Sequence, residues 1–152
     1  SPEIFELHQY LTARFGFASA EEVLSGRGLG HIYAFLAQHS ASEPLPSSQH
    51  IMAHLDSDPL ALKSISILLE VFGCVCGNLA LTHLPFGGIY LVGGMAQALA
   101  DHYSDSLFHS AFAAKGRFSE FMNQFSVNLV QDDHAALAGC IAHLQFFEND
   151  TH

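Results

Sequence analysis

The pattern of apolar and polar positions predicts a chain built mostly of helices. Apolar residues recur at helical spacing from residue 2 to about residue 14, and similar patterns cover residues 29–38, 48–56, 59–83, 95–102, 103–112, 118–124 and 134–147. Ser1-Pro2 and Asp58-Pro59 are typical helix starts, with a capping side chain followed by proline in the first turn. A helix over residues 59–83 would be apolar on nearly all of its sides, which predicts that it is buried between layers of secondary structure.

Two short β-rich segments interrupt the helices. Residues 89–92 are apolar and lie between two pairs of glycines, which predicts a buried strand that is covered on both faces. Residues 126–130 predict a second strand, and the helices between the two imply a crossover with parallel pairing. The first strand ends in Gly93-Gly94, where a ligand or another backbone can approach closely. The alternative is a tight turn that serves packing alone.

Small residues recur along the longest predicted helix. Gly73, Gly77 and Ala80 follow one another at helical spacing. Glycine inside a helix costs up to about 1 kcal/mol relative to alanine, so two of them indicate that another helix packs closely here.

A capping box is predicted at Ser19-Ala-Glu-Glu22, where Ser19 caps a short helix ending near Ser25-Gly26 and Glu22 reaches back to the cap. The cap does not require Glu21. A favourable interaction with the helix dipole explains Glu21 without any ligand, and the alternative is that Glu21 is a ligand-binding residue.

Residues 39–48 contain two prolines and four serines in ten positions. This composition predicts an exposed connection and not a domain boundary. With 152 residues and 49% hydrophobic content, the chain suits one domain or a large part of one.

The charge balance narrows the range of partners. The formal net charge is −10, with only five lysines and arginines, which argues against nucleic acid or an anionic membrane as a partner. Neither a continuous apolar run near the ~20 residues of a membrane span nor a signal segment is evident, so we expect a cytoplasmic location. The cysteines Cys74, Cys76 and Cys140 lie in apolar company and are expected to be reduced core thiols.

No metal site is predicted from the spacing of histidines and cysteines. His50 and His54 lie four residues apart on a predicted helix, but no third ligand is evident. Cys74 and Cys76 would point about 200° apart on a helix. The carboxylate pairs Asp56/Asp58 and Asp132/Asp133 lie at predicted helix caps, which explains them without catalysis.

Several blocks of the sequence resemble bacterial glucokinases. Ser19-Ala-Glu-Glu-Val-Leu-Ser-Gly26, with Gly28-Leu29 just after it, is similar to the Ser-Ala-Glu-x-Val-Leu-Ser-Gly segment of that family. At matching spacing the resemblance continues through residues 77–81, 86–88, 93–94, 111–118 and 137–144. It covers nearly all of the chain outside about residues 39–57. Leu84-Pro85 and Asp133-His-Ala135 depart from the usual family sequence.

The resemblance implies an actin-like ATPase (ribonuclease H-like) fold, of which residues 1–152 would be the C-terminal, large-domain part without its N-terminal strands. It also implies that Glu21 hydrogen-bonds glucose hydroxyls and that Gly93 and Gly94 lie against the nucleotide. The small face at Gly73 and Gly77 matches the family's interdomain helix, whose packing accompanies hinge closure.

The activity implied by the resemblance is phosphorylation of glucose at its 6-hydroxyl, with ATP and Mg²⁺. The catalytic base and the phosphate loops would lie upstream, so the 152 residues alone are expected to be inactive. A homodimer, or self-association through an exposed sheet edge, is also expected. Two alternatives stay open, a non-catalytic regulatory or dimerisation module and a related kinase for another hexose.

Overall fold

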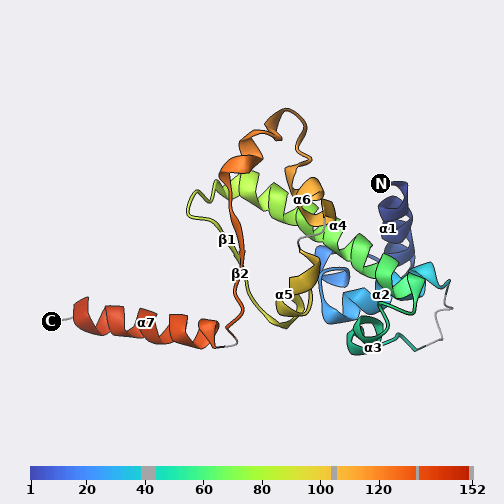
Figure 1. Cartoon of the computed structure of the whole chain (residues 1–152), viewed down its shortest axis with the longest axis horizontal. Helices are drawn as coiled ribbons and strands as arrows, with labels where there is room; N and C mark the ends of the chain where they lie inside the picture. Colours follow the sequence, from blue (N-terminus) through green and yellow to red (C-terminus); the bar gives the residue numbers. More distant parts are fainter. Residues whose placement is uncertain (39–43, 104–105, 133, 151–152) are drawn as a thin grey trace.

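The computed structural model describes residues 1–38, 44–103, 106–132 and 134–150 (Figure 1). Its α-helices are α1 (Pro2–Phe15), α2 (Gly26–Leu36), α3 (Ser48–Ala53), α4 (Pro59–His83), α5 (Gly94–Ala98), α6 (Ser106–Ala113) and α7 (Ala135–Asp150). The 3₁₀ turns are Ala20–Glu22, Ala100–His102, Gly116–Phe118 and Phe121–Gln124, and the strands are β1 (Ile89–Leu91) and β2 (Val127–Leu129). The predicted helix-rich architecture with two parallel strands is confirmed.

Helix α4 runs through the helical body and carries much of its core (Figure 1). It packs against α2 and α6, with residues such as Ile65, Leu68 and Leu69 almost fully buried. Its opposite side is open, since Leu62 and Leu79 are about half exposed, so α4 is buried on one side and not all round.

By length and composition α4 would also suffice to cross a membrane, contrary to the expectation that no segment approaches a membrane span. Lys63 and Glu70 interrupt the apolar sequence of α4, so no continuous apolar run of that length is evident. In the structure, 44% of the apolar 18-residue window within α4 is buried inside the fold.

The small residues of α4 allow the backbone of α6 to lie directly against it. A Cβ added to Gly73 would overlap the carbonyl oxygen of Phe108, and one added to Gly77 would overlap that of Phe112. The predicted close approach of a second helix is therefore confirmed, and that helix is α6 of the same chain.

The two strands form a parallel sheet in which Ile89, Tyr90 and Leu91 pair with Val127, Asn128 and Leu129. Only one face of β1 is covered, because Leu91 is 7% exposed whereas Tyr90 is 62% and Val92 is 53% exposed. The prediction of a strand covered on both faces was wrong. The outward residues are apolar too, so the sequence lacks the polar alternation that marks a half-exposed strand.

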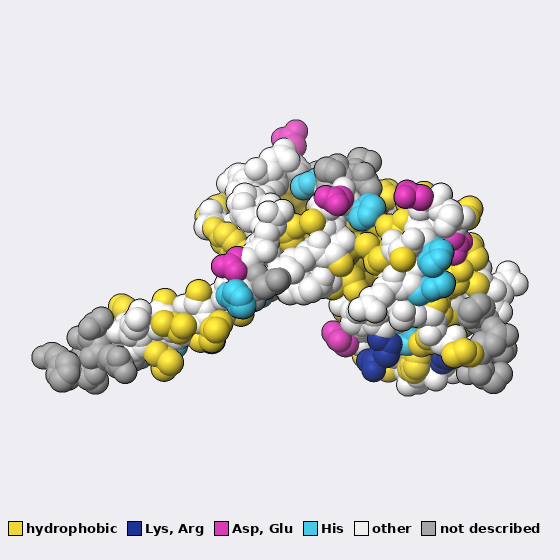
Figure 2. All heavy atoms as spheres, turned by 60° about the horizontal axis from the view of Figure 1, so that its bottom comes forward, with side chains coloured by type: hydrophobic (Ala, Val, Ile, Leu, Met, Phe, Trp, Pro, Cys, Tyr) yellow, Lys and Arg dark blue, Asp and Glu magenta, His cyan; other side chains and the backbone are white. Residues whose placement is uncertain are grey.

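Helix α7 extends away from the rest of the fold and carries exposed hydrophobic side chains along its length (Figures 1 and 2). Leu137, Ile141 and Leu144 are between 48% and 64% exposed. Asp132 lies just before the helix, where its Oδ1 accepts a hydrogen bond from the His134 amide at 2.8 Å and not from an amide within α7, and Asp133 lies outside the described residues.

Smaller differences concern the exposed connection, the helix predicted at 118–124 and the cysteines. Residues 39–43 of the connection lie outside the described residues, and α3 begins at the last residue of the predicted range. In place of the helix predicted at 118–124, one 3₁₀ turn ends at Phe118 and a second covers Phe121–Gln124. Cys76 is buried, and desolvation raises its pKa to about 11, but Cys74 and Cys140 are exposed and are not core residues.

We predict that Gly73→Ala destabilises the fold by about 1–3 kcal/mol, because α4 and α6 must separate to admit the methyl group. This outweighs the roughly 1 kcal/mol that alanine gains over glycine in a helix. Gly139→Ala in α7 is the control, since a Cβ there meets nothing within 4 Å and its φ is not positive. Urea unfolding should show a loss for Gly73→Ala alone; equal midpoints would contradict the close packing.

Asp58 links the start of α4 to α2. Its Oδ1 accepts a hydrogen bond from the Leu60 amide at 2.8 Å, and its Oδ2 accepts one from the Tyr33 hydroxyl at 2.7 Å. These bonds favour the ionised carboxylate, and the one from Tyr33 is the main reason that the pKa of Asp58 is lowered. The same contact raises the pKa of Tyr33.

We predict that the stabilisation from Asp58 is present at neutral pH and is lost on acidification. Because the pKa of Asp58 is lower in the folded state than in the unfolded chain, the contribution is complete above the unfolded pKa and disappears as the pH falls through the folded value. The urea midpoint of Asp58→Asn should therefore fall less between pH 6 and pH 3 than that of the unsubstituted chain. Asp56→Asn is the matched control. If both variants reduced the fall in the urea midpoint equally, the pH-dependent stabilisation could not be attributed to Asp58.

Candidate functional site

The segment that carries Glu21 is a tight turn and not the start of a longer helix. Ala20–Glu22 is a single 3₁₀ turn, and the Ser19 side chain makes no capping hydrogen bond. The capping-box prediction was therefore wrong. The next helix begins at Gly26, three residues before the predicted start, because the Ser25 hydroxyl caps it by accepting a hydrogen bond from the Gly28 amide at 2.9 Å.

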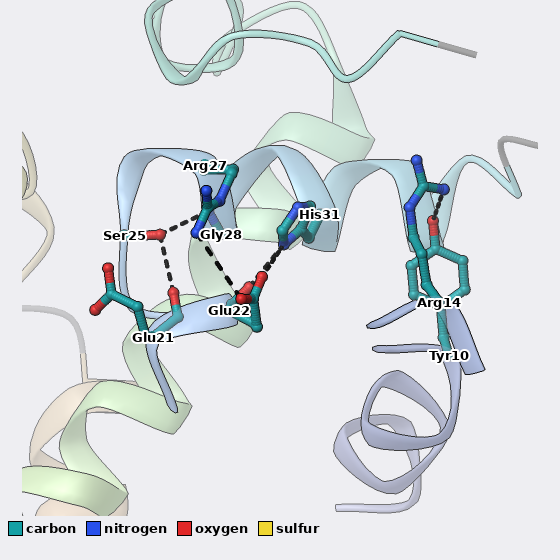
Figure 3. Close-up of polar contacts among 8 residues, drawn as sticks. All are labelled: Tyr10, Arg14, Glu21, Glu22, Ser25, Arg27, Gly28 and His31. Atoms are coloured by element: carbon teal, nitrogen blue, oxygen red, sulfur yellow. Dashed lines mark hydrogen bonds and ion pairs between the residues drawn. The ribbon is translucent and has the colours of Figure 1, made fainter. Parts of the chain in front are cut away.

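A hydrogen bond and a close backbone contact connect the turn to the start of α2. The Ser25 hydroxyl donates a hydrogen bond to the carbonyl oxygen of Glu21 at 3.0 Å (Figure 3). Gly28 lies directly against the backbone of Val23, since an added Cβ would overlap the Val23 carbonyl. Glycine at position 28 is therefore required for the first turn of α2 to reach the Glu21 segment.

Glu21 and Glu22 point in different directions (Figure 3). The Glu22 carboxylate lies 3.4 Å from Nδ1 of His31 and 3.8 Å from the guanidinium of Arg27. Glu21 is exposed, and its carboxylate points away from this group. The turn thus presents one carboxylate to solvent and holds the adjacent one inward.

Gly93 and Gly94 lie between β1 and α5. Gly93 has φ +109°, a conformation that favours glycine, and Gly94 is the first residue of α5. A Cβ at Gly94 would meet nothing within 4 Å, and its φ is not positive. The described residues therefore give no packing or conformational reason for glycine at position 94.

Gly94 lines an open pocket of about 400 Å³ between three helices. The pocket lies where α2, α3 and α5 begin, since Gly26, Ser48 and Gly94 are their first residues. Its full lining is Gly26, Ser48, Gln49, Met52, Gly94, Met95 and Ala98. The methionines and the alanine give it apolar walls, while Ser48 and Gln49 supply a hydroxyl and an amide. Arg27 lines a second opening that shares Gly26 and Ser48 with this pocket.

The structure brings the predicted site residues together only in part. Gly94 lines the pocket, whereas neither Gly93 nor Glu21 does; the pocket and the Glu21 turn are connected through Gly26 at the start of α2. Sequence reasoning missed Ser48, Gln49 and Met52 as lining residues. They lie within residues 39–57, which the resemblance does not cover. The predicted start of a helix at Ser48 was the one indication of structure there.

Among the described residues, no group of three or more histidine, cysteine or carboxylate side chains is placed to bind a metal ion. The rings of His50 and His54 lie with their centroids 4.2 Å apart in a tilted arrangement, and Nδ1 of His54 lies 2.7 Å from the His50 carbonyl oxygen. These two exposed histidines therefore contact each other at the end of α3.

Known proteins resemble this chain both in fold and in sequence. The fold matches a crystal structure of a glucokinase from an Antarctic psychrotroph with a TM-score of 0.81 and 26% identity, over 93% of this chain and 45% of that one. It is thus the helix-rich α/β fold seen in that part of a glucokinase. A model of the glucokinase family matches residues 1–146, and the chain belongs to this family.

Curated relatives support the family assignment. Glucokinases of Neisseria gonorrhoeae and Escherichia fergusonii are each 36% identical to it, over 139 and 140 residues, and cover 90% of this chain. The glucokinase of Stenotrophomonas maltophilia is 30% identical over 152 residues. The chain spans less than half the length of these relatives, between 42% and 45%.

Proposed function

We propose that this chain supplies the adenosine side of the cleft and one sugar contact to a glucokinase, which transfers the γ-phosphoryl group of ATP to the 6-hydroxyl of glucose. The observation that carries the proposal is the family match over residues 1–146, combined with the placement of Glu21 and Gly94. Glu21 is an exposed carboxylate on a fixed turn. Gly94 lines the pocket, and neither packing nor backbone conformation requires a glycine there.

The pocket suits an adenosine moiety. Met52, Met95 and Ala98 offer apolar contact to a purine, and the Gln49 amide and Ser48 hydroxyl offer hydrogen bonds to its polar edge or to the ribose. The absence of a side chain at Gly94 allows a ligand to lie directly against the backbone at the start of α5. The amides in the first turn of α2 and the nearby Arg27 favour an anionic group at the mouth.

Glu21 suits a hexose hydroxyl, because an ionised carboxylate accepts strong hydrogen bonds from neutral donors. Its carbonyl oxygen is held by Ser25, so the backbone that carries the carboxylate is fixed before a sugar binds. Such positioning contributes to phosphoryl transfer without any covalent chemistry at the residue.

Within the part of the chain that the structure describes, no group of three or more histidine, cysteine or carboxylate side chains could hold a metal ion. In phosphoryl transfer Mg²⁺ neutralises charge on the nucleotide phosphates, and we propose that it arrives bound to them. The pocket lining also contains no carboxylate or histidine that could serve as a base. We propose that these 152 residues alone do not transfer phosphate; glucose 6-phosphate formed by the isolated chain in a coupled assay would contradict this.

We predict that the sugar and nucleotide contacts can be separated by two substitutions in the 152-residue chain. Glu21→Gln should weaken glucose binding about tenfold or more, since a hydrogen bond to a charged group contributes about 1.5–3 kcal/mol. Gly94→Val should fill part of the pocket and weaken ADP binding while leaving glucose binding unchanged.

NMR titrations with glucose and with ADP measure both affinities in each variant. Glu120→Gln, an exposed carboxylate outside the pocket lining, is the control. Parallel titrations with fructose and mannose separate glucose from another hexose as the substrate. If both substitutions affected both ligands equally, or if neither ligand bound, the assigned contacts would be wrong.

A second candidate function is a non-catalytic module that regulates or dimerises, and the exposed surface of α7 favours it. Leu137, Ile141 and Leu144 recur at helical spacing and are all exposed. Among the described residues, each strand of the sheet pairs only with the other, so both outer edges are open. We propose that the chain self-associates through these surfaces, and a homodimer is the simplest product.

We predict that Leu144→Glu lowers the self-association of the chain, because it places a charge within the exposed apolar side of α7. Ala142→Glu adds the same charge on roughly the opposite side of the helix and is the matched control. Light scattering over a range of concentrations should show a rise in mean mass that Leu144→Glu reduces and Ala142→Glu does not. A monodisperse monomer for the unsubstituted chain would contradict the proposal.

A further inference from the structure

The core of the described residues contains two fully buried polar side chains, His31 and Ser64. The Ser64 hydroxyl bonds to the Leu60 carbonyl within its own helix, as serine commonly does. His31 is different, because its Nδ1 lies 2.9 Å from the carbonyl oxygen of Glu22, nine residues earlier in the chain. Burying a polar group is unfavourable unless its hydrogen bonds are made, so this contact is what permits a histidine in the core.

The chemistry of this contact fixes where the proton lies. A carbonyl oxygen can only accept a hydrogen bond, so Nδ1 of His31 must carry a proton and act as the donor. The ring also contacts Phe15 at the end of α1, whose centroid lies 4.7 Å from that of the imidazole. His31 thus joins α1, α2 and the Glu21 turn.

The contact acts on the backbone next to Glu21. Ser25 holds the carbonyl of Glu21, and His31 holds the next carbonyl, that of Glu22 (Figure 3). Two successive peptide groups are therefore fixed from the α2 side. The Glu22 carboxylate is also held inward, near His31 and Arg27, which leaves the outward direction to Glu21.

We propose that His31 is a positioning residue that sets the direction of Glu21, by donating from Nδ1 to the main chain of Glu22. The bond orders the turn whether or not a sugar is present. Its role in hexose recognition rests on the function proposed above.

Three substitutions at one position test this proposal. In His31→Asn the side-chain amide nitrogen occupies about the position of Nδ1, so the donor is kept; in His31→Gln the amide lies farther out, near the position of Nε2. His31→Leu removes the donor altogether. Tyr33→Phe is the control on the same helix, because it removes a hydrogen bond to Asp58 and none to the turn.

The first measurement is amide hydrogen exchange of Glu22, Val23 and Leu24, whose N–H groups make the hydrogen bonds of the turn. We expect about three- to tenfold faster exchange in His31→Leu and His31→Gln, within the range for one lost hydrogen bond. His31→Asn should restore the rate to within about twofold, and Tyr33→Phe should leave it unchanged. Nitrogen-15 spectra of the unsubstituted chain should show a protonated Nδ1 at His31.

The second measurement is glucose affinity, which should fall in His31→Gln and recover in His31→Asn, while ADP affinity stays constant. Equal exchange in His31→Gln and His31→Asn, or an unprotonated Nδ1, would overturn the positioning role, even if His31→Leu fails to fold. If glucose does not bind to the unsubstituted chain, the proposed function fails, but the exchange and nitrogen-15 results still decide the role of His31.

Discussion

The backbone contact between α4 and α6 is the constraint on which the rest of the structure depends. At Gly73 and Gly77 there is no room for a side chain, because the carbonyl groups of α6 occupy that space. Helix α6 therefore lies closer to α4 than ordinary side-chain packing allows. The chain between β1 and β2 passes through α6, so this contact also determines where the two strands meet. The Gly93-Gly94 turn is separated from the end of β1 by one residue.

The other side of the core supports the Glu21 turn in a similar way. Helix α2 packs on α4, and Gly28 of α2 lies against the backbone of Val23. The carboxylate at Glu21 is exposed, but the backbone beneath it is fixed by groups that are buried or half-buried. A flexible acidic side chain on a rigid turn loses less conformational freedom on binding than one on a mobile loop. The apolar core and the exposed site are therefore linked through backbone contacts.

Much of the fold was predictable from local signals. The bounds of α4 follow from Asp58-Pro59 and from an apolar pattern of 25 residues, and the parallel pairing follows from two β-rich runs with helices between them. The predictions failed where distant residues decide the outcome. Ser19 and Glu22 have the spacing of a capping box, but His31 and Arg27 attract the Glu22 carboxylate, and Ser25 starts the next helix at Gly26. The spacing of a capping box does not contain the contacts of Glu22 with His31 and Arg27, although the cap at Ser25 is itself a local signal.

The candidate site illustrates the same limit with glycine. In the sequence Gly28, Gly73, Gly93 and Gly94 are the same residue type. The structure separates them, since Gly28 and Gly73 are required by close backbone contacts and Gly93 by its positive φ. Gly94 alone of these four has neither reason, and it lines a pocket with apolar walls, a hydroxyl and an amide. Of the two glycines that follow β1, Gly93 thus allows the backbone to turn, and Gly94 leaves the pocket wall without a side chain. Gly87 and Gly139 likewise meet nothing within 4 Å, so it is the place of Gly94 in the pocket lining, together with the missing side chain, that supports the ligand contact proposed there.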